Sequence, residues 1–100
     1  MESFGLKKEH IDFLKNTFKN YIKDESAKIY IFGSRAKGNY KNFSDVDIAV
    51  DCQSFDDDLR AKIQLAFENS LFPYEVDIVD LNNIKKSFME LIKDSMVELK

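Results

Sequence analysis

Apolar residues recur at helical spacing in three parts of the chain. Over residues 6–22 they fall three to five positions apart, with charged residues between them, which predicts an amphipathic helix. Its apolar face comprises Leu6, Ile11, Leu14, Phe18, Tyr21 and Ile22. A second helix is expected after Ser54 or Asp56, either of which can cap it, and a third after Asn82 or Asn83. Their apolar faces carry Leu59, Ile63, Ala66 and Phe67, and Ile84, Phe88, Leu91 and Ile92.

Three shorter segments have the composition of strands. Residues 27–32 are β-branched and aromatic and stop at Gly33, and residues 74–80 follow a proline. Residues 45–51 alternate without a fault between apolar and acidic or small residues. The predicted order is α-β-β-α-β-α with a polar loop over residues 33–44, which indicates an α+β (mixed α/β) domain with a small mixed sheet flanked by helices.

Composition narrows the class of protein. A length of 100 residues predicts one domain, 1–100, and 44% apolar residues can form a core. A net charge of −3 argues against direct nucleic-acid binding. No leader or membrane segment is recognisable, so we expect a cytoplasmic protein without membrane contact. The single Cys52 excludes an internal disulfide, and the single His10 is expected to be a solvated residue on the first helix.

Acidic residues gather on one face of the predicted strands. Asp45 and Asp47 lie two residues apart, so they project from the same side of a strand at about 6 to 7 Å. Asp77 sits inside an apolar strand that can lie beside them. Carboxylates held together repel each other unless a cation neutralises them, and hard oxygen ligands suit Mg²⁺ or Mn²⁺. The alternative is an ordinary solvated strand face.

The loop before these acids has the composition of an anion site. Gly33 and Ser34 close the first strand, where a small residue followed by a hydroxyl lets backbone N–H groups approach a phosphate. Arg35 and Lys37 add two cations to the same turn. A basic surface turn is the alternative interpretation.

Three stretches together resemble a known family. They are Gly-Ser-Arg-Ala-Lys-Gly at 33–38, Ser-Asp-Val-Asp-Ile-Ala-Val at 44–50 and Val-Asp-Ile-Val-Asp-Leu at 76–81. This series is similar to the signature of the polymerase-beta-like nucleotidyltransferases, and in particular to their minimal nucleotidyltransferase branch. Many members of that branch are antitoxins paired with an HEPN-domain ribonuclease toxin. The chain departs from the pattern at Lys37, where arginine is frequent, and in its C-terminal segment.

The resemblance implies both an activity and a set of roles. The expected reaction transfers AMP from ATP to a hydroxyl, with a tyrosine of the HEPN toxin as acceptor and Mg²⁺ or Mn²⁺ as cofactor. Asp45, Asp47 and Asp77 would be the catalytic and metal-binding residues. The residues expected to bind the nucleotide are Gly33, Ser34, Arg35, Lys37 and Ser44. Two alternatives stay open: an antitoxin that acts by binding alone, and a catalytic subunit that modifies a small-molecule hydroxyl.

Overall fold

A four-stranded mixed sheet forms the centre of the computed structural model, which describes residues 2–100 and the side chains from Ser3 onward. The strand order is β5 (Val76–Asp80), β4 (Val46–Asp51), β3 (Lys28–Phe32) and β6 (Val97–Glu98). β3 runs antiparallel to both of its neighbours, whereas β4 and β5 are parallel. The expected mixed α+β architecture is therefore confirmed.

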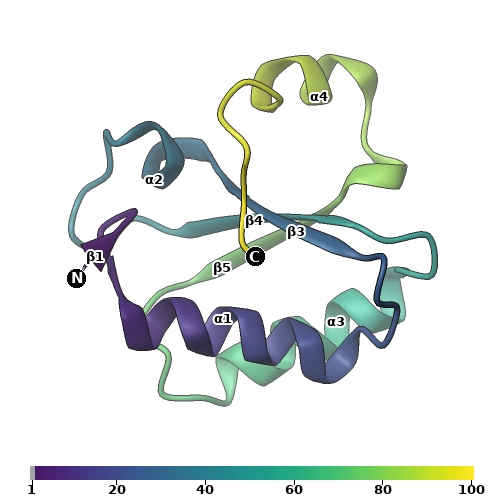
Figure 1. Ribbon diagram of the computed structural model, residues 1–100, viewed down its shortest axis with the longest axis horizontal. Coiled ribbons are helices and arrows are strands. Elements are labelled where there is room, and N and C mark those ends of the chain that lie inside the picture. The colour runs from purple at the N-terminus through teal and green to yellow at the C-terminus, as the bar shows by residue number, and fades with distance from the viewer. Residues whose placement is uncertain (1) are drawn as a thin grey trace.

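Helices cover the sheet on both sides (Figure 1). α1 (Lys8–Tyr21) and α3 (Asp57–Glu68) lie side by side along one face, and α4 (Lys86–Ile92) lies over the other. Shorter elements complete the chain: a hairpin of β1 (Glu2–Ser3) and β2 (Leu6–Lys7), the helix α2 (Gly33–Lys37) after β3, and the 3₁₀ turn η1 (Leu81–Asn83) after β5. Within residues 2–100, no helix has the length and apolar character needed to cross a membrane.

The alternation along β4 separates the core from the acidic face. Val46, Ile48 and Val50 belong to the larger hydrophobic cluster, which the α1 and α3 side chains complete. Ala49 points the other way, into a smaller cluster with Phe32 and residues of α4. Asp47 shares the side of Ala49 because side chains two apart on a strand point to the same face. The acids therefore lie on the α4 side of the sheet, away from the main core.

Most of the expected elements are confirmed, with bounds that differ by one or two residues. Asp56 caps α3 by accepting a hydrogen bond from the Leu59 backbone N–H at 2.8 Å. Cys52 is buried at the end of β4. The expectation for the last helix was wrong at its start: Asn82 and Asn83 lie in η1, and α4 begins only at Lys86.

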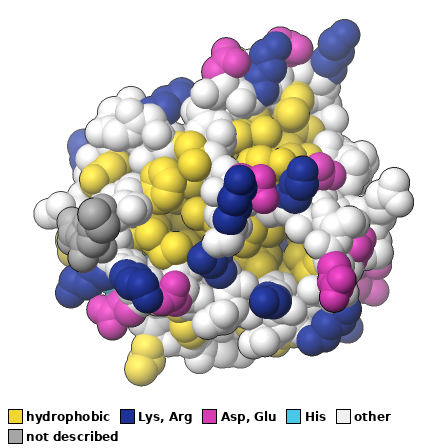
Figure 2. Space-filling view, viewed as in Figure 1, with side chains coloured by type: hydrophobic (Ala, Val, Ile, Leu, Met, Phe, Trp, Pro, Cys, Tyr) yellow, Lys and Arg dark blue, Asp and Glu magenta, His cyan; other side chains and the backbone are white. Residues whose placement is uncertain are grey.

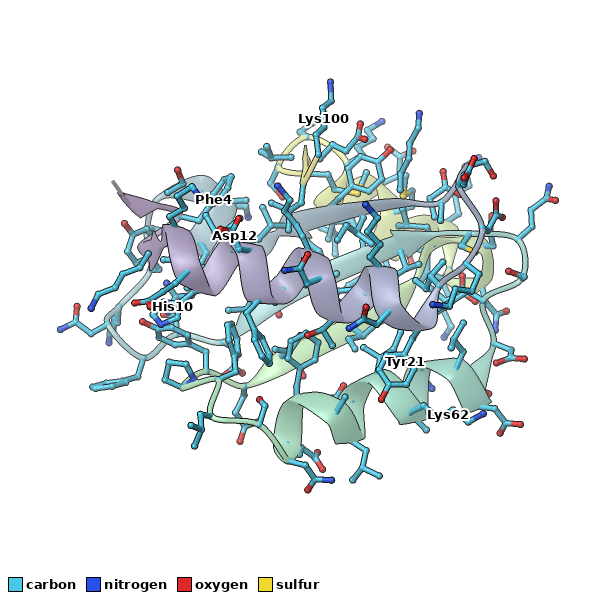
Figure 3. All side chains as sticks on the ribbon, turned by 60° about the horizontal axis from the view of Figure 1, so that its bottom comes forward. Phe4, His10, Asp12, Tyr21, Lys62 and Lys100 are labelled. Carbon is cyan, nitrogen blue, oxygen red and sulfur yellow. The ribbon has the colours of Figure 1, made fainter. Side chains whose placement is uncertain are left out.

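Three further expectations need correction. Residues 33–44 are not loop throughout, because α2 begins directly at Gly33. Leu91 does not face the core but is 75% exposed, since α4 is only two turns long and contacts the sheet along a narrow stripe. His10 on α1 (Figure 3) is half-buried rather than solvated, and its ring lies edge-on against Phe72 and Tyr74. The hairpin and β6, at two residues per strand, were too short to predict.

Candidate active site

Asp47 and Asp77 are direct neighbours on adjacent parallel strands. They pair in the register of β4 with β5, so their side chains leave the same side of the sheet one strand spacing apart, about 4.8 Å. Asp45 lies just before β4 begins and has the same side-chain parity as Asp47. The structure therefore brings together the three acids that the sequence singled out, at one end of the acidic face.

The three carboxylates influence one another electrostatically. The pKa of Asp47 is raised to about 6, first because burial disfavours its charged form and then because of repulsion from Asp77 and from Asp45. Asp47 is half-buried, while Asp45 and Asp77 are exposed. Asp47 is thus the member of the group that gains most from a neighbouring positive charge.

Gly33 lies directly against Asp47. Its φ of +75° is in the left-handed region, and a Cβ on Gly33 would overlap the Oδ2 atom of Asp47. Phe32, at the start of the turn, is the register partner of Asp47 on β3. Gly33 therefore lets the chain turn sharply from β3 into α2. The absence of a side chain also lets the Gly33 backbone lie against the Asp47 carboxylate.

The first turn of α2 begins beside Asp47, because Gly33 is its first residue. No side chain caps the helix, because residue 32 at the cap position is a phenylalanine. Ser34 is half-buried in this turn, and its carbonyl closes the helix by accepting from Gly38 and Asn39 at 3.0 and 3.1 Å. Uncapped N–H groups carry partial positive charge and can accept an anion such as a phosphate.

Two of the residues expected to bind nucleotide lie farther along this segment. Lys37 is exposed in the last turn of α2. The Ser44 hydroxyl accepts a hydrogen bond from the Lys41 backbone N–H at 2.7 Å, which closes a turn directly before Asp45. The structure thus gives Ser44 a part in shaping the loop.

Arg35 does not face the acids. The residue is 1% exposed, and its guanidinium donates to three backbone carbonyls: Ser44 O at 2.8 and 3.0 Å, Phe4 O at 3.0 Å and Asn42 O at 3.4 Å. The same group lies over the rings of Tyr40 and Tyr74, 5.3 and 4.5 Å from their centroids. Its donors are engaged in this clamp, so we replace the expected phosphate contact with a structural role: Arg35 fixes the residue before Asp45.

A cleft of about 700 Å³ opens beside Asp47 and Asp77. Phe32 and Phe88 line it on the side of the acids, and Asp57, Arg60, Ala61 and Gln64 of α3 line it on the other side of β5. The cleft lining offers a ligand three carboxylates, two aromatic rings and one guanidinium, which is paired with the carboxylate of Asp57. The cleft thus has the mixed apolar and polar lining of a small-ligand or peptide site.

Residues 12–99 match the sequence model of the family described as "Polymerase beta, Nucleotidyltransferase". The chain belongs to this nucleotidyltransferase family. It is 32% identical over 97 residues to the probable protein adenylyltransferase MntA of Haemophilus influenzae, covering 93% of this chain and 83% of that protein. The resemblance noted in the three sequence stretches is confirmed.

Chains of solved toxin–antitoxin structures share the fold. One, a toxin–antitoxin with AMP-PNP, superposes with a TM-score of 0.75 at 24% identity, covering 90% of this chain and 72% of that one. Another, a tri-AMPylated Shewanella oneidensis HEPN toxin in complex with MNT antitoxin, gives 0.70 at 21% identity, covering 93% and 71%. These likenesses show the polymerase-beta-like fold.

The acids of this nucleotidyltransferase have the right chemistry for a hard divalent cation. Carboxylate oxygens are the ligands that Mg²⁺ prefers, and a cation would relieve the repulsion from Asp77 and Asp45 that adds to burial in raising the Asp47 pKa. In residues 2–100, however, no three Asp, Glu, His or Cys side chains converge closely enough to hold an ion as they stand. Binding would require Asp45 or Asp77, both exposed, to turn toward Asp47.

A second hollow lies away from the acids of the nucleotidyltransferase site. It measures about 510 Å³ between the C-terminal half of α1 and the end of the chain, over an apolar floor with lysines around it. The lysines are Lys15, Lys19, Lys23, Lys28 and Lys100. In Figure 2, basic side chains stand among hydrophobic ones on the face that carries α1 and the C-terminus. Asp24, Glu25 and Glu98 share the rim, so its charge is mixed.

Proposed function

We propose that this nucleotidyltransferase is an antitoxin that transfers AMP from ATP to a tyrosine of a cognate HEPN-domain ribonuclease toxin and thereby silences it. The observation that carries the proposal is the contact of Gly33 with Asp47, which joins an uncapped helix start to a pair of carboxylates. The helix start suits a triphosphate, and the carboxylates suit the cations that accompany it. The relative named as a probable protein adenylyltransferase and the fold shared with MNT antitoxins in complex with HEPN toxins support this assignment.

Asp45, Asp47 and Asp77 would hold Mg²⁺, which supplies charge neutralisation of the triphosphate when bound. The backbone N–H groups of Gly33 and Ser34 would bind the β- and γ-phosphates at the start of α2. Lys37 adds a positive charge to the same turn as an exposed side chain. Arg35 and Ser44 act indirectly, because their hydrogen bonds hold the loop that leads to Asp45.

The transfer is an in-line displacement at the α-phosphorus. The phenolic oxygen forms a bond to phosphorus, the bond from phosphorus to the oxygen shared with the β-phosphate breaks, and pyrophosphate leaves with that electron pair. The phenolic proton passes to the carboxylate of Asp77, the more exposed member of the cross-strand pair. Orientation and charge stabilisation account for the rate, since the protein forms no covalent bond to the nucleotide.

The test uses a cognate HEPN-domain protein as the acceptor. Wild type, Mg²⁺ and α-labelled ATP are incubated with that protein, the two are separated, and the mass and ribonuclease activity of the HEPN protein are measured. We expect added AMP and a lasting loss of activity. The matched variant Asp45→Asn/Asp47→Asn should inhibit only while bound. Full activity and unchanged mass after separation from wild type would instead identify an antitoxin that acts by binding alone.

A further inference from the structure

The outer edge of β5 carries no further described strand next to the acid pair, although Val76 and Ile78 are only 2% and 5% exposed. β5 is the terminal strand of the sheet, with β4 as its one neighbour among the described strands. The Val46 N–H donates to Glu75 O at 2.8 Å, so in this parallel ladder the peptide groups of residues 75, 77 and 79 point toward β4. Those of Val76 and Ile78 therefore point outward.

The contacts on this edge agree with that assignment. The Gln64 side chain reaches from α3 and donates to Val76 O at 2.6 Å, which occupies one outward carbonyl. The peptide group of Ile78, one step further along, has no hydrogen-bond partner within residues 2–100. An edge strand with free donors and acceptors is a template for another extended segment.

The cleft described above follows this edge. Ile78 lies in its lining between two walls, one formed by α3 with Arg60 and the other by the acids with Phe88. The cleft therefore passes around the edge of β5 and connects the two faces of the sheet. A strand placed there meets both walls, because its side chains alternate between the faces.

We propose that the protein acceptor enters as an extended segment that pairs with β5 as an additional strand and presents a tyrosine over Asp77. This inference rests on the proposed function and specifies how its acceptor is recognised. Main-chain hydrogen bonds to Ile78 supply affinity, and side-chain alternation directs one residue toward Asp77 and Phe88 and its neighbours toward Arg60.

The geometry favours an acceptor residue whose hydroxyl lies far from its own backbone. An added strand lies two strand spacings, roughly 10 Å, from β4, so its hydroxyl must lean back across Asp77 to reach the acids. Tyrosine extends far enough, whereas serine and threonine carry their hydroxyl on Cβ. Phe32 and Phe88, edge to face with ring centroids 6.2 Å apart, line the cleft on the side where the tyrosine ring would pass.

A peptide probe tests the pairing directly. The probe is a blocked peptide of about seven residues, rich in Val and Thr, with a central tyrosine flanked by glutamates. Each backbone nitrogen is methylated in turn, and transfer from α-labelled ATP is measured. Only alternate N–H groups of the peptide face β5. Methylation at those positions should lower labelling by about tenfold, and methylation at the positions between them should leave labelling within about twofold of the unmethylated peptide. Replacing the tyrosine by serine should abolish labelling.

Variants of the chain test the position of the segment. Arg60 forms an ion pair with Asp57 at 3.0 Å in this wall, so Arg60→Glu turns a neutral pair into two acids and should raise KM for the glutamate-flanked peptide by about tenfold at unchanged kcat. Lys62→Glu makes the same charge change on the same helix, outside the cleft lining, and should leave KM unchanged (Figure 3). The strand pairing would be overturned by an equal change of KM in the two variants. It would also be overturned if methylation lowered labelling equally at all positions of the peptide.

The HEPN protein is assayed in parallel to separate the two hypotheses. Labelling of that protein without labelling of any peptide would overturn strand addition and leave the proposed function intact. Absence of AMP transfer to both would refute the proposed function, and with it this inference. Labelling of both, with the alternating pattern, would support each of them.

Discussion

Gly33 and Asp47 are in contact, with no room for a side chain between the glycine backbone and the Oδ2 atom of the carboxylate. Gly33→Ala should therefore displace Asp47 and lower AMP transfer by about a hundredfold or more, since small displacements in a reacting site have large effects. Transfer from α-labelled ATP measures this loss.

Gly38→Ala is the matched control for that change. Gly38 also has a positive φ, +86°, so both alanines share a conformational penalty of about 1–2 kcal/mol. A Cβ at Gly38 meets no atom within 4 Å. Equal loss of activity in the two variants would show that backbone strain, and not the contact with Asp47, is responsible.

Asp47 should make the folded protein less stable as the pH rises. Its pKa is about 6 in the folded state against an ordinary value near 3.9, so between roughly pH 4 and 6 the folded state holds a proton that the unfolded state has lost. The stabilisation present at low pH is lost across this window. The melting temperature of wild type relative to Asp47→Asn should fall from pH 4 to pH 7, and a constant difference would contradict the raised pKa.

Divalent cations should act on the same group of acids. Mg²⁺ with a non-hydrolysable ATP analogue should raise the melting temperature, because a ligand that binds only the folded state stabilises it. The triple variant Asp45→Asn/Asp47→Asn/Asp77→Asn lacks the repelling charges and should not respond. An equal response in the two proteins would show that the carboxylates are only a solvated face.

Arg35→Lys tests the clamp on the loop. Lysine keeps the charge but cannot donate to Ser44 O twice while also reaching Phe4 O, so buried carbonyls lose their partners at a cost of about 1–3 kcal/mol each. Urea unfolding should show this loss. Lys37→Ala, on the exposed side of the same helix, should stay within about 0.5 kcal/mol of wild type.

The three main strands and the shared face of Asp45 and Asp47 were predictable because their signals are local. The alternation through Asp45 and Asp47 is a property of seven consecutive residues. The register that sets Asp47 beside Asp77 is not local, since it depends on how two strands thirty residues apart align. The structural role of Arg35 was missed for the same reason. Its partners are the backbone carbonyls of residues 4, 42 and 44, and because every residue has a carbonyl, the sequence does not indicate which ones Arg35 contacts.

Arg35 joins parts of the chain that are far apart in the sequence. It links the N-terminal hairpin through Phe4, the loop through Ser44 and the approach to β5 through Tyr74. A loop tied at several points cannot open alone, so amide hydrogens of residues 39–44 that are protected should exchange at the rate of the whole domain and not at that of a surface segment. We therefore expect the loop before Asp45 to resist local opening as the sheet does, and loss of Phe4 to weaken the hold of Arg35 on that loop.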